Sequence, residues 1–331
     1  QPIPGQLRLP QGPARVKPIS GKAGLTAAKP AQNHCAMDHT AFIKTLAPET
    51  RAALNQPSNA AGLRHLALHL GLIALAGTAI ALRIPLWWLL LPVQGVLLVF
   101  LFTLEHECTH NTPFKSRWLN TLAGHASGLV LLLPFTWFRY FHLAHHKFTN
   151  DPARDPELAH PPIQSRTQWL RHISGLPYWA AQIRLIFRLA RGADSAPYLP
   201  SGAKPRMQAE ALIMLALYTL TLASLIFTPL LFWVWILPAL IGQPALRLYL
   251  LAEHGDCPQV ANMLLNTRTT FTTRIMRFLA WNMPYHAEHH TLPQVPFYQL
   301  PRLHRLMRNH LGTTANGYGE FTRAYLARRK P

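Results

Sequence analysis

HECTH at residues 106–110, HLAHH at 142–146, EHG at 253–255 and HAEHH at 286–290 together hold nine of the eighteen histidines in this chain of 331 residues. Imidazole is a common ligand of zinc, copper and iron, and one ion takes at most about six protein ligands. Nine clustered histidines therefore indicate a site for two metal ions.

The spacing inside these segments predicts that the histidines converge. Residues three or four apart lie on the same face of a helix. The two histidines of HECTH can therefore point together, and so can the three in each of HLAHH and HAEHH. The candidate metal ligands are His106, His110, His142, His145, His146, His254, His286, His289 and His290.

Acidic residues accompany the histidines, since eight of the thirteen in the chain lie within or near the four segments. A metal-bound histidine usually donates its other ring N–H to a carboxylate or a carbonyl, which orients the ring. Direct ligation and pairing with nearby basic residues stay open as alternatives. The acids expected to support the ligands are Glu107, Asp151, Asp155, Glu253, Asp256 and Glu288.

The composition favours an integral membrane protein. Only 14% of the residues are charged, against about a quarter in typical soluble domains. Nearly uncharged stretches are long enough for a bilayer, which takes about 20 residues of helix. We predict an all-α protein with four transmembrane helices arranged as two hairpins. The predicted spans are 64–83, 86–105, 210–228 and 231–252.

A fifth apolar stretch, 119–137, lies between HECTH and HLAHH. A full crossing would place these two segments on opposite faces of the membrane, where they could not share a site. Backbone that leaves the helical conformation at membrane depth has to be covered by protein or line a cavity. We therefore expect this stretch to turn back, as a helix or re-entrant segment.

The net charge of +19 sets the expected orientation. The hairpin turns carry almost no lysine or arginine, whereas 1–65, 111–209 and 267–331 carry nearly all of it. The positive-inside rule then places both termini and all four histidine segments in the cytoplasm, as in a bacterial inner-membrane protein. Because the basic residues flank apolar spans and interleave with tryptophan and tyrosine, they favour a bilayer surface over nucleic acid as the partner.

The distribution of apolar and basic residues divides the chain into an N-terminal arm and a membrane domain. Residues 1–60 are rich in proline, alanine, glutamine and lysine and are expected to form a loosely ordered cytoplasmic arm, followed by a membrane domain at 61–331. A histidine-rich cytoplasmic cap is expected to comprise 106–209 and 253–331. A glycine-rich dinucleotide loop of the G-x-G-x-x-G type is absent, so electrons for a redox reaction would come from a separate protein.

HECTH also matches H-E-x-x-H, in which two histidines bind zinc and the glutamate, here Glu107, is the general base of a metalloprotease. An intramembrane protease of this kind would use one zinc ion and leave the other three histidine segments without a role. A membrane protein that binds metal without catalysis is a second alternative from a different class.

H-x-x-x-H, H-x-x-H-H and H-x-x-H-H in this order, between and after pairs of membrane helices, resemble the membrane fatty acid desaturase and hydroxylase superfamily over about residues 60–310. The sequence around the last segment, WNMPYHAEHHTLPQVPFYQLPRLH, is similar to bacterial desaturases and carotenoid ketolases. The EHG setting of His254 is similar to that in membrane alkane hydroxylases. Asn282 stands where some members place a water-holding asparagine, so we add it to the supporting residues.

The resemblance implies two non-haem iron ions, dioxygen as co-substrate and a di-iron centre that performs the catalysis without a separate catalytic side chain. It also implies a lipid or other hydrophobic substrate and a separate electron donor, such as ferredoxin or rubredoxin with its reductase. The expected reaction introduces a double bond into a fatty acyl or lipid chain. The alternative within the superfamily is a hydroxylase or ketolase acting on an alkane, a carotenoid or another small amphiphile.

Overall fold

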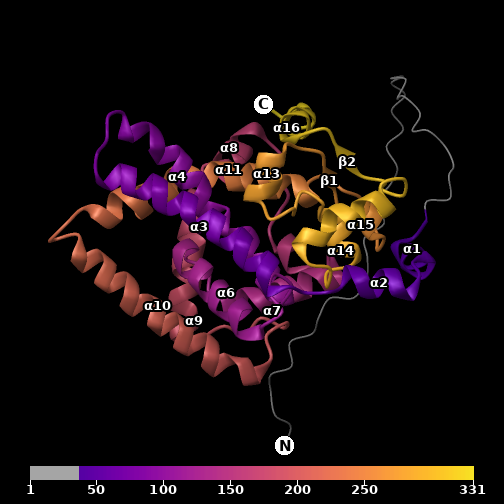
Figure 1. Ribbon diagram of the computed structural model, residues 1–331, viewed down its shortest axis with the longest axis horizontal. Helices are drawn as coiled ribbons and strands as arrows, with labels where there is room; N and C mark the ends of the chain where they lie inside the picture. Colours follow the sequence, from indigo (N-terminus) through magenta and orange to yellow (C-terminus); the bar gives the residue numbers. More distant parts are fainter. Residues whose placement is uncertain (1–36) are drawn as a thin grey trace, which may run out of the picture. The chain divides into compact units, whose positions relative to one another are not determined.

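The structure of the protein is a computed structural model, and it describes residues 37–331. This part of the chain is mostly helical, and its regular structure consists almost wholly of helices (Figure 1). Its α-helices are α1 (His39–Thr45), α2 (Pro48–Leu54), α3 (Asn59–Ala81), α4 (Leu90–Val99), α5 (Leu101–His110), α6 (Arg117–Leu131), α7 (Phe135–Phe148), α8 (Arg166–Ile173), α9 (Leu176–Ala190), α10 (Lys204–Ser224), α11 (Leu237–His254), α12 (Met263–Asn266), α13 (Arg274–Leu279), α14 (His286–Thr291), α15 (Leu300–Met307) and α16 (Tyr318–Ala327).

Strand is confined, among residues 37–331, to two short segments. These are β1 (Thr269–Thr270) and β2 (Thr314–Ala315), which pair in parallel. The parallel pair ties the segment before α13 to the segment before α16. The predicted all-α class is thus confirmed for the described residues.

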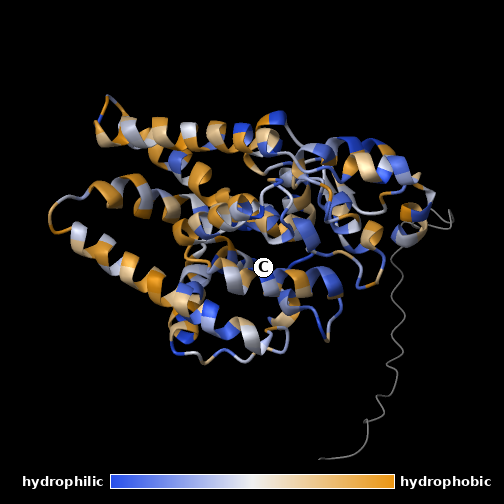
Figure 2. Ribbon diagram, turned by 60° about the horizontal axis from the view of Figure 1, so that its bottom comes forward, coloured by the Kyte–Doolittle hydropathy of each residue, from blue (hydrophilic) through white to orange (hydrophobic). Residues whose placement is uncertain are grey.

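Four helical runs in the described residues are long and apolar enough to cross a membrane. Figure 2 shows hydrophobic residues along these runs and more hydrophilic residues at the opposite end of the molecule. The runs are Pro48–Ala81, Trp87–His110, Ser201–Ser224 and Phe232–His254. They contain the cores of all four predicted spans but extend past them, because the helices continue into their polar flanks.

The second of these runs carries the first histidine segment. α5 ends only at His110, where Asn111 adopts a left-handed conformation with φ 60° and closes the helix. The residues from Leu101 to His110 contain neither glycine nor proline, so nothing interrupts the helix after the apolar stretch ends. HECTH therefore forms the end of a helical run that is long and apolar enough to cross a membrane.

Glycines bring the second and fourth spans into close contact. A Cβ added to Gly95 on α4 would lie 2.9 Å from the backbone nitrogen of Gly242 on α11, and one added to Gly242 would meet the backbone of Gly95. Small residues allow membrane helices to approach backbone to backbone. The close packing of α4 against α11 brings their ends, which lead to HECTH and EHG, to the same region.

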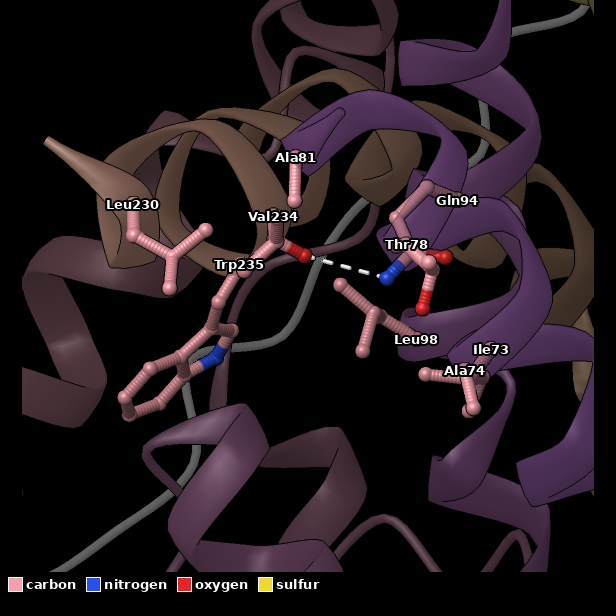
Figure 3. A pocket seen from close by; sticks show the side chains of 10 residues that line it. Ile73, Ala74, Thr78, Ala81, Gln94, Leu98, Leu230, Val234 and Trp235 are labelled. Atoms are coloured by element: carbon pink, nitrogen blue, oxygen red, sulfur yellow. Dashed lines mark hydrogen bonds between the residues drawn. The ribbon is translucent and has the colours of Figure 1, made fainter. Parts of the chain in front are cut away.

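An open pocket of about 380 Å³ lies between α3, α4 and the π-helical segment Phe232–Ile236 that precedes α11 (Figure 3). At its edge the Nε2 atom of Gln94 donates a hydrogen bond of 3.0 Å to the carbonyl of Val234. Pro238 stands four residues later and has no N–H to give to that carbonyl. Gln94 thus supplies the donor that the helix lacks, which explains an amide side chain inside a membrane span.

The stretch 119–137 does not form one straight helix. It falls on α6 and α7, whose axes differ by 100° across a short break. Leu132 closes α6 in a left-handed conformation with φ 58°, and Pro134 immediately precedes the first residue of α7. Because the histidines on either side of this stretch meet, as described below, the chain turns back within it.

Part of the expected N-terminal arm is folded. Residues 1–36 lie outside the described residues, but the following segment forms α1 and α2. Phe42 on α1 is 2% exposed and Leu54 on α2 is fully buried, and both belong to the main hydrophobic core. The expectation of a loose arm up to residue 60 is therefore corrected for residues 37–60, since apolar side chains spaced along these two helices anchor them.

Candidate metal centre

All nine histidines singled out from the sequence lie together at the ends of four helices. His106 and His110 are on the last turns of α5, and the three histidines of HLAHH follow each other on α7. His254 is the last residue of α11, and the three histidines of HAEHH make up half of the six-residue helix α14. Helices far apart in the sequence thus end at one place, and each contributes imidazoles there.

Five of the histidines form a first group, in which one nitrogen from each lies within 4.8 Å of the others. Within it, Nε2 of His142 is 2.9 Å from Nε2 of His110. The rings of His106 and His142 lie 4.1 Å apart between centroids. The group consists of His106, His110, His142, His146 and His289.

The second group contains His145, His254 and His290, again with nitrogens within 4.8 Å of one another. Nε2 of His254 lies 3.1 Å from Nε2 of His145 and 3.1 Å from Nε2 of His286. These contacts bring His286 to the same group. The two groups adjoin each other, since the rings of His146 and His290 stack at 4.0 Å.

The nitrogen atoms of both groups fit metal ions. Buried nitrogens without any hydrogen-bond partner include both ring nitrogens of His106 and the Nε2 atoms of His146, His289 and His290. Buried polar atoms in proteins are normally satisfied, so unpartnered atoms that converge indicate a missing ligand. Two imidazole nitrogens bound about 2.1 Å from one ion at right angles lie about 3 Å apart, which agrees with the close Nε2 pairs.

Burial keeps the imidazoles of the last segment neutral. The pKa values of His286, His289 and His290 lie well below the usual value, first because burial penalises the charged form and then because neighbouring imidazoles do. A histidine binds a metal through the lone pair of its neutral form. These three rings are therefore in the protonation state that metal binding requires.

Three of the expected acids contact the outer nitrogen of a histidine. Asp155 accepts a hydrogen bond of 2.9 Å from Nδ1 of His145. Burial alone would raise the pKa of Asp155, but the hydrogen bond and charge of His145, together with hydrogen bonds from the backbone of Glu157 and Asn150, lower it below its usual value. Oxygens of Glu107 and Glu253 lie 3.4 Å from Nδ1 of His289 and Nδ1 of His286, respectively.

Glu288 supports the metal centre indirectly, through residues other than the nine histidines. Its two carboxyl oxygens accept hydrogen bonds from Thr269 and from His304, so it ties α14 to β1 and α15 and does not contact an imidazole of the nine directly. The carboxylate is fully buried, and both partners come from other elements. It fixes the helix that carries HAEHH.

Three other residues that were expected to support the ligands make their contacts away from the nine histidines. Asp151 pairs with Arg154 on the surface, and Asp256 pairs with Arg328 and Arg329 near α16. Asn282 donates its side-chain hydrogen bond to the carbonyl of Phe297. The structure therefore gives these three residues partners other than the nine histidines.

Two supporting residues were missed in the sequence. The carbonyl of Asn266 accepts a hydrogen bond of 3.2 Å from Nδ1 of His254, and its side chain donates to the carbonyls of Thr149 and Val260. Nδ1 of His290 lies 3.1 Å from the hydroxyl of Thr149. Both residues are neutral and lie outside the four histidine segments, so neither charge nor helical spacing points to them.

The sequence matches the family described as fatty acid desaturase over residues 83–322, a range that includes all nine histidines and more than half of the chain. The sn-1 oleoyl-lipid 12-desaturase of Picosynechococcus sp. is 33% identical over 34% of this chain and 36% of its own length. The sn-1 acyl-lipid omega-3 desaturase (ferredoxin) of Nostoc sp. is 38% identical over 22% of this chain and 19% of its own.

A longer match is to a plant protein, the acyl-lipid omega-3 desaturase (cytochrome b5) of the endoplasmic reticulum of Arabidopsis thaliana. It is 26% identical over 73% of this chain and 69% of its own length. The chain thus matches only about a third or less of the length of the proteins from Picosynechococcus and Nostoc. The match to the plant protein covers most of both chains. The similarity therefore extends across spans and histidine segments together.

Proposed function

The chain belongs to the fatty acid desaturase family, and we propose that it is a membrane-bound di-iron oxidoreductase that uses dioxygen to introduce a double bond into a fatty acyl or lipid chain. The observation that carries this proposal is the convergence of nine histidines from four helices into two adjoining groups. A single-zinc protease built on HECTH would not need the seven other imidazoles.

In this proposal the two groups hold one iron each. His106, His110, His142, His146 and His289 would bind the first ion, and His145, His254, His286 and His290 the second. When bound, the pair of irons supplies the ability to activate dioxygen with two donated electrons and to remove hydrogen from an unactivated C–H bond. Imidazole is a suitable ligand for iron, and the absence of a cysteine from either group fits that choice.

The protein's own part is to orient the imidazoles and keep water away. Asp155 and the carbonyl of Asn266 accept the Nδ1–H of His145 and His254, so the Nε2 lone pairs of both rings face the second group. Such hydrogen bonds fix the tautomer and raise the basicity of the ligand. His289 is fully buried and His142 is 2% exposed, whereas His110, His146 and His254 are half-buried, so most of the imidazoles lie away from bulk water.

The substrate class follows from where the site lies. Two of the four apolar runs end at the histidines, in His110 and His254, so a hydrocarbon chain can approach between helices without leaving an apolar environment. The three relatives described above are named for oleoyl-lipid and acyl-lipid substrates. Their names support an acyl lipid as the substrate here.

We place both termini and the metal centre on the cytoplasmic side of a bacterial-type inner membrane. The support is the excess of lysine and arginine in the segments outside the apolar runs, within a net charge of +19. The same basic surface would attract an acidic electron carrier and speed its association at low salt. Ferredoxin or rubredoxin with a reductase fits this role, and one relative is named for ferredoxin.

Product analysis tests the proposal. The purified full chain would be loaded with iron, supplied with dioxygen and a reducing system, and given a panel of acyl lipids. We expect a new double bond, formed as two hydrogens leave adjacent carbons while dioxygen is reduced to two waters. A hydroxyl or keto product would move the chain to the hydroxylase or ketolase branch, and proteolysis with one bound zinc would overturn the proposal.

A further inference from the structure

Helix α7 carries three of the nine histidines, yet its own sequence offers no cap for its start. The helix begins at Phe135 after Pro134, which makes no side-chain hydrogen bond to the helix. The first N–H groups of a helix have no partner inside it. A buried helix start of this kind has to be satisfied from another part of the chain.

Glu210 on α10 provides that partner. Its Oε1 accepts a hydrogen bond of 2.8 Å from the backbone nitrogen of Phe135, and its Oε2 accepts one of 3.0 Å from that of Thr136. The carboxylate is 9% exposed and lies where the positive end of the helix dipole favours a negative charge. A membrane-spanning helix thus supplies the N-cap of a histidine-bearing helix.

His125 holds the carboxylate in place. Nδ1 of this histidine, on α6, lies 2.7 Å from Oε1 of Glu210, and its ring packs edge-on against Phe135 at 5.2 Å. Gly124 and Gly128 leave room at the same break, since a Cβ on either would collide with Phe135 or with the carbonyl of Leu133. Glu210 therefore sits at the junction of α6, α7 and α10.

We propose that Glu210 is a positioning residue, which sets the direction of α7 and thereby places His142, His145 and His146 in both metal-binding groups. His145 follows Phe135 by ten residues, which is about 15 Å of helix. A tilt of about 4° at the start would move its imidazole by about 1 Å. Ligand distances tolerate only about 0.2 Å, so loss of the cap disturbs both groups. The inference rests on the proposed metal-binding function.

The test compares variants of the full chain in detergent by iron titration and by the visible spectrum of the cobalt(II)-loaded protein, which reports coordination geometry. Glu210→Ala is expected to weaken metal binding about tenfold to a hundredfold and to change the spectrum. Glu210→Gln keeps one acceptor oxygen and is expected to fall between this variant and the wild type. Gln208→Ala is the matched control, because Gln208 on the same helix bonds only to the carbonyl of Ala190.

A rescue variant separates positioning from general stability. Pro134 has the extended backbone of an N-cap residue, with φ −61° and ψ 113°, so Pro134→Ser can cap α7 locally. Added to Glu210→Ala, it is expected to restore most of the metal affinity and the wild-type spectrum. If Glu210→Ala does not fold, Glu210→Gln and its combination with Pro134→Ser carry the comparison.

The inference would be overturned if Glu210→Ala kept the metal affinity and the spectrum of the wild type, even if its Tm were lower. If only Glu210→Gln folds, the same result in that variant would overturn it. So would a failed rescue in a folded double variant. A wild-type chain that binds no metal would instead refute the proposed function. The two failures are therefore distinguishable.

Discussion

The Oε1 atom of Glu107 lies 3.4 Å from Nδ1 of His289, while Oε2 of the same carboxyl group accepts hydrogen bonds from Thr112 and from the backbone nitrogen of Phe297. The glutamate of H-E-x-x-H is thus held by two hydrogen bonds of its own and lies beside a histidine from another segment. A protease would instead need this group free to act on water.

Glu107→Gln separates the two roles. In a zinc protease this change would remove activity and leave the metal bound. Here we expect metal content and affinity to fall together with turnover, by roughly tenfold to a hundredfold, because the acceptor beside His289 is replaced. Metal analysis and turnover on the same preparation check this, and full metal occupancy with no turnover would contradict it.

Removing a proposed ligand from either group should abolish turnover. We expect His289→Ala in the first group and His145→Ala in the second to lose bound iron, because each ring is buried and no other side chain replaces its nitrogen. His160→Ala serves as the control, since this histidine is exposed and belongs to neither group. Full activity in His145→Ala would show that the ligand assignment is wrong.

Two aspartates four residues apart give a matched pair. Asp155→Asn should weaken metal binding about tenfold or more, because the acceptor of the His145 N–H loses its charge. Asp151→Asn should leave binding unchanged, because Asp151 pairs with Arg154 at the surface. Isothermal titration of metal into both variants checks the contrast, and equal effects would contradict the geometry of this turn.

Asn266→Ala should destabilise the protein by about 1–3 kcal/mol, because it leaves the buried carbonyl of Thr149 without its donor. Thermal unfolding of the metal-free protein in detergent measures this effect. Asn316→Ala, at an exposed position, is the control. An unchanged Tm in Asn266→Ala would mean that water replaces the lost hydrogen bonds.

Chelation should lower the Tm of the wild-type protein. Metal ions bind the folded chain and not the dispersed histidines of the unfolded one, so saturation stabilises by about 3 kcal/mol or more, or roughly 5–10 °C. The shift should reverse when iron is returned. A Tm that is identical with and without chelator would indicate that the nine histidines hold no ion.

Most of the architecture could be predicted from local patterns. Runs of uncharged residues located the four spans, and the three- and four-residue spacing of histidines predicted that rings from each helix would face one place. The return of the chain between HECTH and HLAHH followed from requiring one shared site. The segment around Phe42 and Leu54 was expected to belong to a loose arm, because its flanks have that composition, whereas both side chains are buried in the main core.

The supporting contacts were harder to predict, because they depend on turns and on long-range packing. Asp151 and Asp155 are both acids in one turn, and only the folded backbone directs the second toward His145. Glu210 lies at the edge of an apolar span, and nothing near it in sequence indicates a bond to the start of α7. Periodicity specifies which face of a helix a residue occupies but not which distant helix meets it.

The most direct test of the central claim is the iron content of the detergent-purified chain, measured together with the lipid product that it forms under dioxygen and a reducing system. We predict close to two irons per chain and a new double bond in an acyl lipid. One bound zinc, with no oxygen consumption and no altered lipid, would contradict the account.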